Sequence, residues 1–281
     1  MSEAFRAYYA IPRTIVSRDG RPINALIGFH NCLKKLFNTF EPEFCATAWS
    51  YGGPTFRHEL LPEYKSHRTK PDLLTAQKEL LEAYLRWLGI PQFSCRGLEA
   101  DDVLATLANQ LESGGYHVVL DTVDKDLLAM VSAMVNVWMP RSKTLWSCEQ
   151  VVRKFGVPPS GLSDFLALMG DKADGIPRVS EFTRLEAIEL IKKYGNLRVV
   201  LEERLSELPK LQKEKLDRNR NLIQRNLLLT HLRLDAPINT DPVLPSADQL
   251  RNALSLATDS LRSKDLAFLE PTTGLQGRLF A

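Results

Sequence analysis

Seven acidic side chains gathered in three short clusters are the feature that most constrains this chain. The clusters read GLEADDVL, TVDKDLLAM and GDKADGIP, and their carboxylates belong to Glu99, Asp101, Asp102, Asp124, Asp126, Asp171 and Asp174. Carboxylates that pack together repel one another unless cations lie between them. Oxygen ligands without Cys or His favour Mg²⁺ or Mn²⁺, and two Mg²⁺ ions about 4 Å apart commonly serve enzymes that cut phosphodiesters. We therefore expect a fold that brings the clusters together around divalent metal ions.

The hydrophobic pattern up to about residue 147 predicts alternating strands and helices. Apolar runs predict strands over 44–49, 91–95, 116–124 and 134–139, and helical spacing predicts helices over 22–40, 71–89, 99–115 and 125–133. Such alternation is typical of an α/β fold with a parallel sheet. Ligands of these sheets bind beyond the carboxyl ends of the strands, which is where Asp124 and Asp126 are expected to lie.

The first acidic cluster has two interpretations when it is taken alone. Glu99 and Asp102 are three residues apart at the start of a predicted helix and share a face. Acidic side chains there also complement the positive end of the helix dipole, which is a purely structural role. The occurrence of three clusters at comparable places favours the metal interpretation.

Beyond about residue 147 only helical patterns follow. We predict an α/β core over residues 1–150, a helical region over 151–240 and a C-terminal extension over 241–281. In the extension, residues 246–257 have helical spacing. The division between the core and the helical region is expected between residues 145 and 160.

Composition describes an ordinary soluble globular protein of 281 residues with 44% hydrophobic and 25% charged residues. No apolar run reaches the roughly 18 residues that span a bilayer, and no secretory signal is visible. We expect a cytoplasmic, nucleoid-associated monomer with no membrane partner. The net charge is only +2, but basic residues concentrate over 57–70 and 210–225, as phosphate-binding surfaces require.

The acidic motifs, in this order and spacing, resemble those of the 5′ nuclease family. That family includes the N-terminal domain of bacterial DNA polymerase I and stand-alone flap endonucleases. The resemblance takes in RDGRPINALIGF (18–29) and GPTFRHELLPEYKSHR (53–68) and extends over residues 2–240. It implies a PIN-like core with a parallel sheet, a helical arch, and a helix–three-turn–helix that grips duplex DNA.

The resemblance also implies an activity and its residues. The family removes 5′ flaps or nucleotides from DNA, and RNA primers, with two divalent metals. The seven acidic residues fall on positions of metal ligands or of groups that support them. The arch positions that contact phosphates near the scissile bond are occupied by Arg57, Tyr64, Lys65 and Arg68. Lys and Arg can stabilise charge on a transferring phosphate, and the Tyr64 ring could stack on a base. Without the resemblance, this segment would be interpreted as an exposed charged helix.

Basic residues of the helical half are expected to touch the duplex backbone in a salt-sensitive way. They are Arg178, Arg184, Lys213, Lys215, Arg218 and Arg220. The alternative for residues 213–225 is a solvated helix face.

The resemblance breaks down at two metal-binding positions of the family, both at or before residue 50. The family opens with an apolar strand that ends in a metal-binding Asp, whereas SEAFRAYYAIP resembles the helix after that strand. Either the start is misassigned or another segment fills the place of the strand, because unpaired buried backbone groups are costly. Ser50 occupies the position of a second metal-binding Asp, and a neutral hydroxyl is a weak ligand for Mg²⁺.

The duplex-gripping hairpin differs as well. The family has a Gly-Ile-Gly turn near a phosphate and a monovalent cation such as K⁺, but Glu181 and Thr183 replace the glycines here. Neither adopts positive φ as easily as Gly. Glu181 also adds a negative charge, which Arg178 and Arg184 are expected to offset in part. We expect a rearranged grip on DNA, and the K⁺ site is in doubt.

The sequence leaves more than one function open. The first is a Mg²⁺-dependent, structure-specific 5′-3′ exonuclease or flap endonuclease that acts on DNA in replication or repair. The alternative is a catalytically impaired nuclease-like protein that binds branched DNA or a protein partner. A different phosphohydrolase built on the surviving acidic residues is the third.

Overall fold

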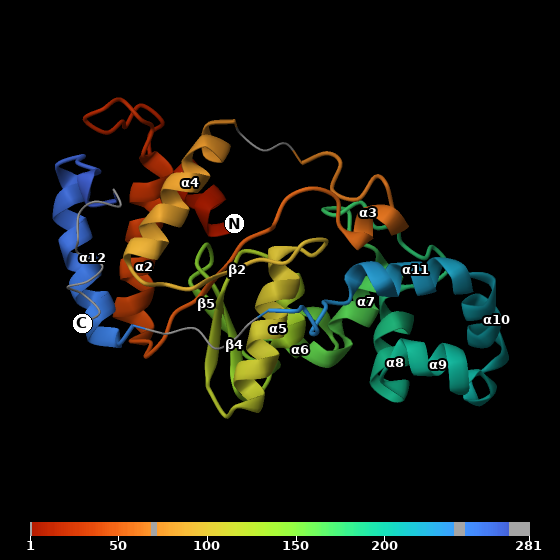
Figure 1. The fold of residues 1–281 in the computed structure, drawn as a ribbon. Helices are drawn as coiled ribbons and strands as arrows, with labels where there is room; N and C mark the ends of the chain where they lie inside the picture. Colours follow the sequence, from red (N-terminus) through yellow and green to blue (C-terminus); the bar gives the residue numbers. More distant parts are fainter. Residues whose placement is uncertain (1, 69–71, 239–244, 270–281) are drawn as a thin grey trace. The chain divides into compact units, whose positions relative to one another are not determined.

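The computed structural model describes residues 2–68, 72–238 and 245–269 and divides into two compact units (Figure 1). One unit draws on residues 1–50, 69–94 and 237–281, and the other on residues 51–68 and 95–236. Each unit is therefore assembled from stretches that are far apart in the sequence. The predicted domain boundaries near residues 150 and 240 follow the order of the chain instead, and they stay a prediction.

The first unit is mainly helical. Its elements are α1 (Ser2–Ala10), α2 (Asn24–Phe40), α4 (Asp72–Trp87), α12 (Ala247–Arg262), the 3₁₀ turn η4 (Ala267–Leu269), and the two-residue parallel strands β1 (Thr47–Ala48) and β2 (Gln92–Phe93). Helices α1 and α2 approach closely at Gly28, where a Cβ atom would lie 2.7 Å from the carbonyl oxygen of Ala7. Leu26, Tyr84 and Leu250 are fully buried in the core that joins α2, α4 and α12.

The second unit combines a small sheet with helices. The sheet has the order β3 (Val118–Asp121), β4 (Val135–Met139) and β5 (Thr144–Trp146), and it is flanked by α5 (Ala100–Ser113) and the 3₁₀ helix η1 (Asp126–Met130). The remaining elements are α3 (Phe56–Leu60), α6 (Cys148–Phe155), η2 (Pro159–Gly161), α7 (Leu162–Met169), α8 (Arg184–Tyr194), α9 (Leu197–Glu203), η3 (Leu205–Glu207), α10 (Lys210–Arg218) and α11 (Arg220–Thr230). One hydrophobic core, which includes Val137, Leu166 and Leu227, joins the sheet to the helices.

The predicted α/β class is confirmed, and two of its details are corrected. The sheet is not wholly parallel, because β5 was not predicted and pairs antiparallel with β4, while β3 and β4 are parallel. The predicted helix over 125–133 is only the short 3₁₀ helix η1. The backbone N–H of Asp126 donates to the Asp124 carboxylate at 3.1 Å, so the segment starts as a tight local turn. In the part of the chain that the structure describes, no helix could cross a membrane.

Candidate metal centre and its basic surround

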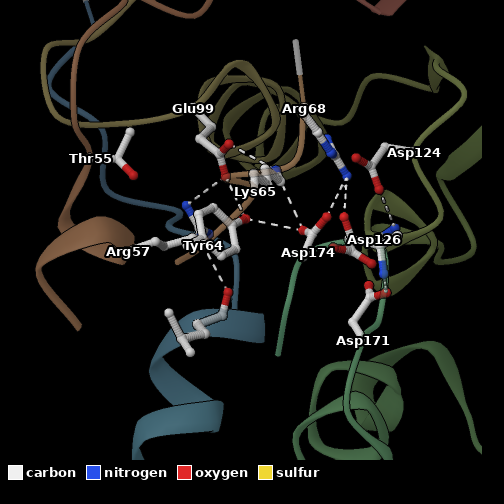
Figure 2. A network of polar contacts seen from close by, with 12 residues as sticks. Thr55, Arg57, Tyr64, Lys65, Arg68, Glu99, Asp124, Asp126, Asp171 and Asp174 are labelled. Atoms are coloured by element: carbon white, nitrogen blue, oxygen red, sulfur yellow. Dashed lines mark hydrogen bonds and ion pairs between the residues drawn. The ribbon is translucent and has the colours of Figure 1, made fainter. Parts of the chain in front are cut away.

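Three carboxylates converge at one place in the second unit. Asp126 begins η1, and Asp171 and Asp174 lie in the turn that follows α7. One oxygen from each residue lies within 4.8 Å of the others, and Figure 2 shows the three side chains grouped together. Two backbone hydrogen bonds of 2.9 and 2.8 Å between Asp171 and Ile176 close the turn. Asp126 thus joins two residues that lie 45 and 48 positions further along the sequence in one anionic cluster.

The chemistry of this cluster fits a hard divalent cation. All three donors are carboxylate oxygens, which suits Mg²⁺ or Mn²⁺. Asp171 and Asp174 are buried. Burial, and after it the charge of the neighbouring Asp124 carboxylate, raise the pKa of Asp126 to about 7. The same two causes, burial first and then Asp124, raise the pKa of Asp101 to about 7. Both values reflect burial first and then repulsion from Asp124, and a bound cation would counter both effects.

Lys125 and Arg68 supply part of the missing positive charge. The Lys125 ammonium contacts the Asp171 carboxylate and lies 3.3 Å from Asp126. Burial by itself lowers the pKa of Lys125, but these carboxylates outweigh it and raise the pKa above its ordinary value. The Arg68 guanidinium contacts Asp174 and also donates to a backbone carbonyl. Lys125 was missed in the sequence, although its position between two acidic residues in VDKD was a usable signal.

Tyr64 and Lys65 connect Glu99 to the cluster. The Tyr64 hydroxyl donates to Glu99 at 2.9 Å and to Asp174 at 3.1 Å, and the Lys65 ammonium donates to Glu99 at 2.8 Å (Figure 2). The expectation that a base stacks on Tyr64 is wrong for this structure, because Tyr64 is only 2% exposed. Burial and the charge of Glu99 raise the pKa of Tyr64, which keeps the phenol protonated as a donor.

Arg57 and Asp102 form a buried ion pair that was not expected. Two guanidinium nitrogens of Arg57 donate to the two carboxylate oxygens of Asp102 at 2.7 and 2.8 Å, and both residues are buried. Arg57 also donates to the carbonyl oxygens of Leu229 and His231 at the end of α11. This placement corrects one prediction, because Arg57 is buried rather than exposed for a phosphate. The alternative of an exposed charged helix does not hold either, since α3 covers only Phe56–Leu60.

The sequence offered two roles for Asp102, a metal ligand or a group that supports the ligands, and its contacts favour the second. Besides the pair with Arg57, its oxygens accept the backbone N–H groups of Glu99 and Arg233, both at 3.0 Å. With every oxygen engaged in this way, Asp102 anchors the start of α5. The structural interpretation of the segment GLEADDVL therefore holds for Asp102. Glu99 instead accepts hydrogen bonds from Tyr64 and Lys65, on the side of Asp174.

The basic residues of the helical half are engaged in local contacts. Arg218 donates to Glu181 at 2.6 Å, and Asn219 donates to the same carboxylate at 2.8 Å. Arg178 donates instead to the carbonyl oxygen of Phe182, and Arg184 to the carbonyl oxygens of residues 154 and 155. The prediction that Arg178 and Arg184 offset Glu181 is therefore wrong.

The other members of this group lie on α10 and α11. Lys215 pairs with Glu186 at 2.6 Å, Arg220 pairs with Asp217 at 3.0 Å, and Lys213 is exposed. Thr183 has a local reason for replacing a glycine. Its side chain accepts the backbone N–H of Glu186 and caps the N-terminus of α8.

Comparisons of sequence relate the chain to known proteins. The model of the 5′-3′ exonuclease N-terminal resolvase-like domain matches residues 1–156, and that of the 5′-3′ exonuclease C-terminal SAM fold matches residues 157–252. A 5′-3′ exonuclease of Aquifex aeolicus is 35% identical over 79% of this chain and 78% of its own length. DNA polymerase I of Mycobacterium tuberculosis is 37% identical over 86% of this chain, but only 27% of the polymerase is covered. The chain thus spans about a quarter of that relative.

Solved structures share the fold. A T5 protein co-crystallised with metal ions aligns with a TM-score of 0.64 and 19% identity over 95% of both chains. A bacteriophage T5 flap endonuclease in complex with DNA and metal ions aligns with a TM-score of 0.64 and 20% identity over 92% of this chain and 96% of the other.

Proposed function

This chain belongs to the 5′-3′ exonuclease family, and from that membership we propose that it is a Mg²⁺- or Mn²⁺-dependent nuclease that removes 5′ flaps or 5′-terminal nucleotides from DNA. The observation that carries the proposal is the convergence of Asp126, Asp171 and Asp174 within 4.8 Å. The alternative, a protein that recognises branched DNA without cutting it, is not favoured by relatives that are named as exonucleases.

Five carboxylates are the candidates for holding metal. Asp126, Asp171 and Asp174 would hold one divalent ion, and Asp101 with Asp124 would contribute to a second. When bound, such ions polarise a phosphodiester and neutralise the charge that develops on it. The two raised pKa values support this assignment, because a bound cation would counter the burial and the repulsion from Asp124 that raise the pKa of Asp101 and Asp126.

The two basic side chains beside the carboxylates, Lys65 and Arg68, differ in their exposure to solvent. Lys65 is largely buried and lies 2.8 Å from Glu99 and 3.5 Å from Asp174, so its charge is held in a defined place. Arg68 is 46% exposed and can reach a phosphate that enters the site. Both stabilise negative charge on a phosphate in the proposed reaction. Tyr64 orients the Glu99 and Asp174 carboxylates through its hydroxyl.

The duplex is proposed to lie against the helical half. Exposed Lys213 and the partly exposed Arg218 offer charge to the backbone, and the T5 flap endonuclease was solved with DNA. RNA primers as substrates and a monomeric state remain part of the proposal. Ser50 belongs to the first compact unit, and its role in place of a carboxylate is proposed from the sequence alone.

The experiment that tests the function is cleavage of a 5′-labelled flap substrate in Mg²⁺ and in Mn²⁺. Asp174→Asn should abolish cutting, while Asp248→Asn, an equivalent change at an 87% exposed carboxylate of α12, should leave it intact. Binding of the flap without cutting would support the recognition protein instead. An increase in cutting by Ser50→Asp would show that the missing carboxylate limits the rate.

A further inference from the structure

The side chain of Asn226 hydrogen-bonds to both ends of the turn that carries two of the clustered carboxylates. Asn226 lies on α11 with no exposed surface, and its side-chain amide nitrogen donates to the carbonyl oxygens of Ala167 at 2.9 Å and Pro177 at 2.7 Å. Those two carbonyl groups lie on either side of the turn that contains Asp171 and Asp174. One side chain therefore ties together the two ends of the loop.

The turn needs support from outside itself because it follows a helix end. The last four carbonyl groups of a helix have no partner within it. In α7, Leu166 accepts from the backbone of Gly170 at 2.8 Å and Leu168 from the backbone of Val179 at 2.9 Å. Ala167 has Asn226 as its donor instead. The exit of α7 and the return of the chain at Pro177 are thus fixed by one amide group.

The side-chain oxygen of Asn226 indicates which part of the amide is used. This oxygen is buried and has no hydrogen-bond partner among the described residues. A buried acceptor without a partner is unfavourable, and such exceptions call for a specific explanation. A side chain that uses both of its N–H groups and leaves its oxygen idle is present for donation. The two donated bonds both end on the turn.

Other residues at the end of α11 also contact α7. The hydroxyl of Thr230, four residues after Asn226, donates to the carbonyl oxygen of Ser163 at 2.9 Å. His231 lies 2.6 Å from the buried carboxylate of Asp164. Asn226 therefore projects from a helix whose position on α7 is set independently by other contacts.

We infer that Asn226 is a positioning residue for the metal site, which holds Asp171 and Asp174 in the arrangement that meets Asp126. The inference rests on the proposed function, because it gives the turn its role as a carrier of metal ligands. Asn226 touches no reacting group and acts only through the turn. Nothing in the stretch NLIQRNLLLTHL sets this asparagine apart from Asn221 on the same helix.

The test compares Mn²⁺ binding by the free protein, followed by electron paramagnetic resonance, in wild type and in Asn226→Ala and Asn226→Ser. We expect Asn226→Ala to weaken Mn²⁺ binding about tenfold, as is typical when groups that orient metal ligands are removed. Asn226→Ser should lose less, because a hydroxyl can still donate one bond. Asn221→Ala removes an exposed amide from the same helix and should change nothing. Binding of duplex DNA in EDTA should be the same for all variants.

Three results would overturn the inference. Equal Mn²⁺ affinity in Asn226→Ala and wild type would show that the turn keeps its shape without the amide. A parallel loss of DNA binding in EDTA, with Asn226→Ser as impaired as Asn226→Ala, would indicate a general structural role. Wild-type Mn²⁺ binding that is no stronger than in Asp174→Asn would refute the proposed metal site itself and remove the premise.

Discussion

The buried pair of Arg57 and Asp102 offers the sharpest test of how the second unit is held together. Asp102→Asn keeps the shape of the side chain but removes its charge. The buried Arg57 guanidinium then loses its bidentate partner and keeps only the more distant Glu99 carboxylate, at 3.4 Å, as a counterion among the described residues. In the described part of the chain, the other hydrogen-bond acceptors of Arg57 are the backbone carbonyl groups of Leu229 and His231. Removing one partner of a buried ion pair typically costs about 3–5 kcal/mol. In a domain of this size that lowers the melting temperature by about 10 °C.

The assay is thermal and urea unfolding followed by circular dichroism at neutral pH. Replacing both partners with apolar residues, in Arg57→Met with Asp102→Leu, should recover much of the loss, because no buried charge is then left unpaired. A loss below about 1 kcal/mol in Asp102→Asn, the usual value of an exposed pair, would refute the reasoning. Arg57 would then be free to leave its site and contact phosphate, as the sequence had suggested.

The same pair predicts the direction of an acid dependence. Burial tends to raise the pKa of Asp102, but the hydrogen bonds and charge of Arg57 outweigh it and lower the pKa below the ordinary value. The folded form therefore holds its proton less tightly than the unfolded form. The contribution to stability is present above the unfolded pKa of about 3.9 and is lost as the pH falls through the lower, folded value. In Asp102→Asn this acid-sensitive step should be absent.

Three further perturbations follow from the structure. Gly170→Ala should lower the free energy of unfolding in urea by about 3 kcal/mol or more. The reason is that φ is +72° and a Cβ atom would lie 2.6 Å from a backbone nitrogen. Gly20→Ala, at φ +84° in open space, is the control and should cost only about 1–2 kcal/mol. Burial lowers the pKa of His30 to about 4, so below pH 6.5 the unfolded chain binds a proton more tightly than the folded protein. About 3 kcal/mol of stability should therefore be lost as the pH falls from 6.5 through 4. A urea midpoint that stays constant over this range would contradict the prediction. Lys125→Met should tighten Mn²⁺ binding about tenfold if 1.4 kcal/mol of repulsion is removed. Lys192→Met, at an exposed lysine of α8, is a control that should leave the binding unchanged.

Local pattern was sufficient for much of the architecture. The long amphipathic helices α2, α4 and α5 lie where their apolar spacing predicts them, because a helix buries the face that its own sequence defines. The acidic clusters could be recognised for the same reason, since each lies within a few residues. Their likeness to known motifs was enough to indicate the family.

Contacts between distant residues decided the rest. Arg57 is separated by 172 residues from the carbonyl group of Leu229 that it contacts, and Asn226 by 59 from Ala167. Whether a basic or amide side chain faces solvent or is buried depends on which elements pack over it, and those elements are remote in sequence. The three-residue strand β5 was likewise missed because pairing with β4 defines it. The sequence by itself therefore determined the family and the acidic residues, whereas only the tertiary structure separated the residues that face the site from those that hold it in place.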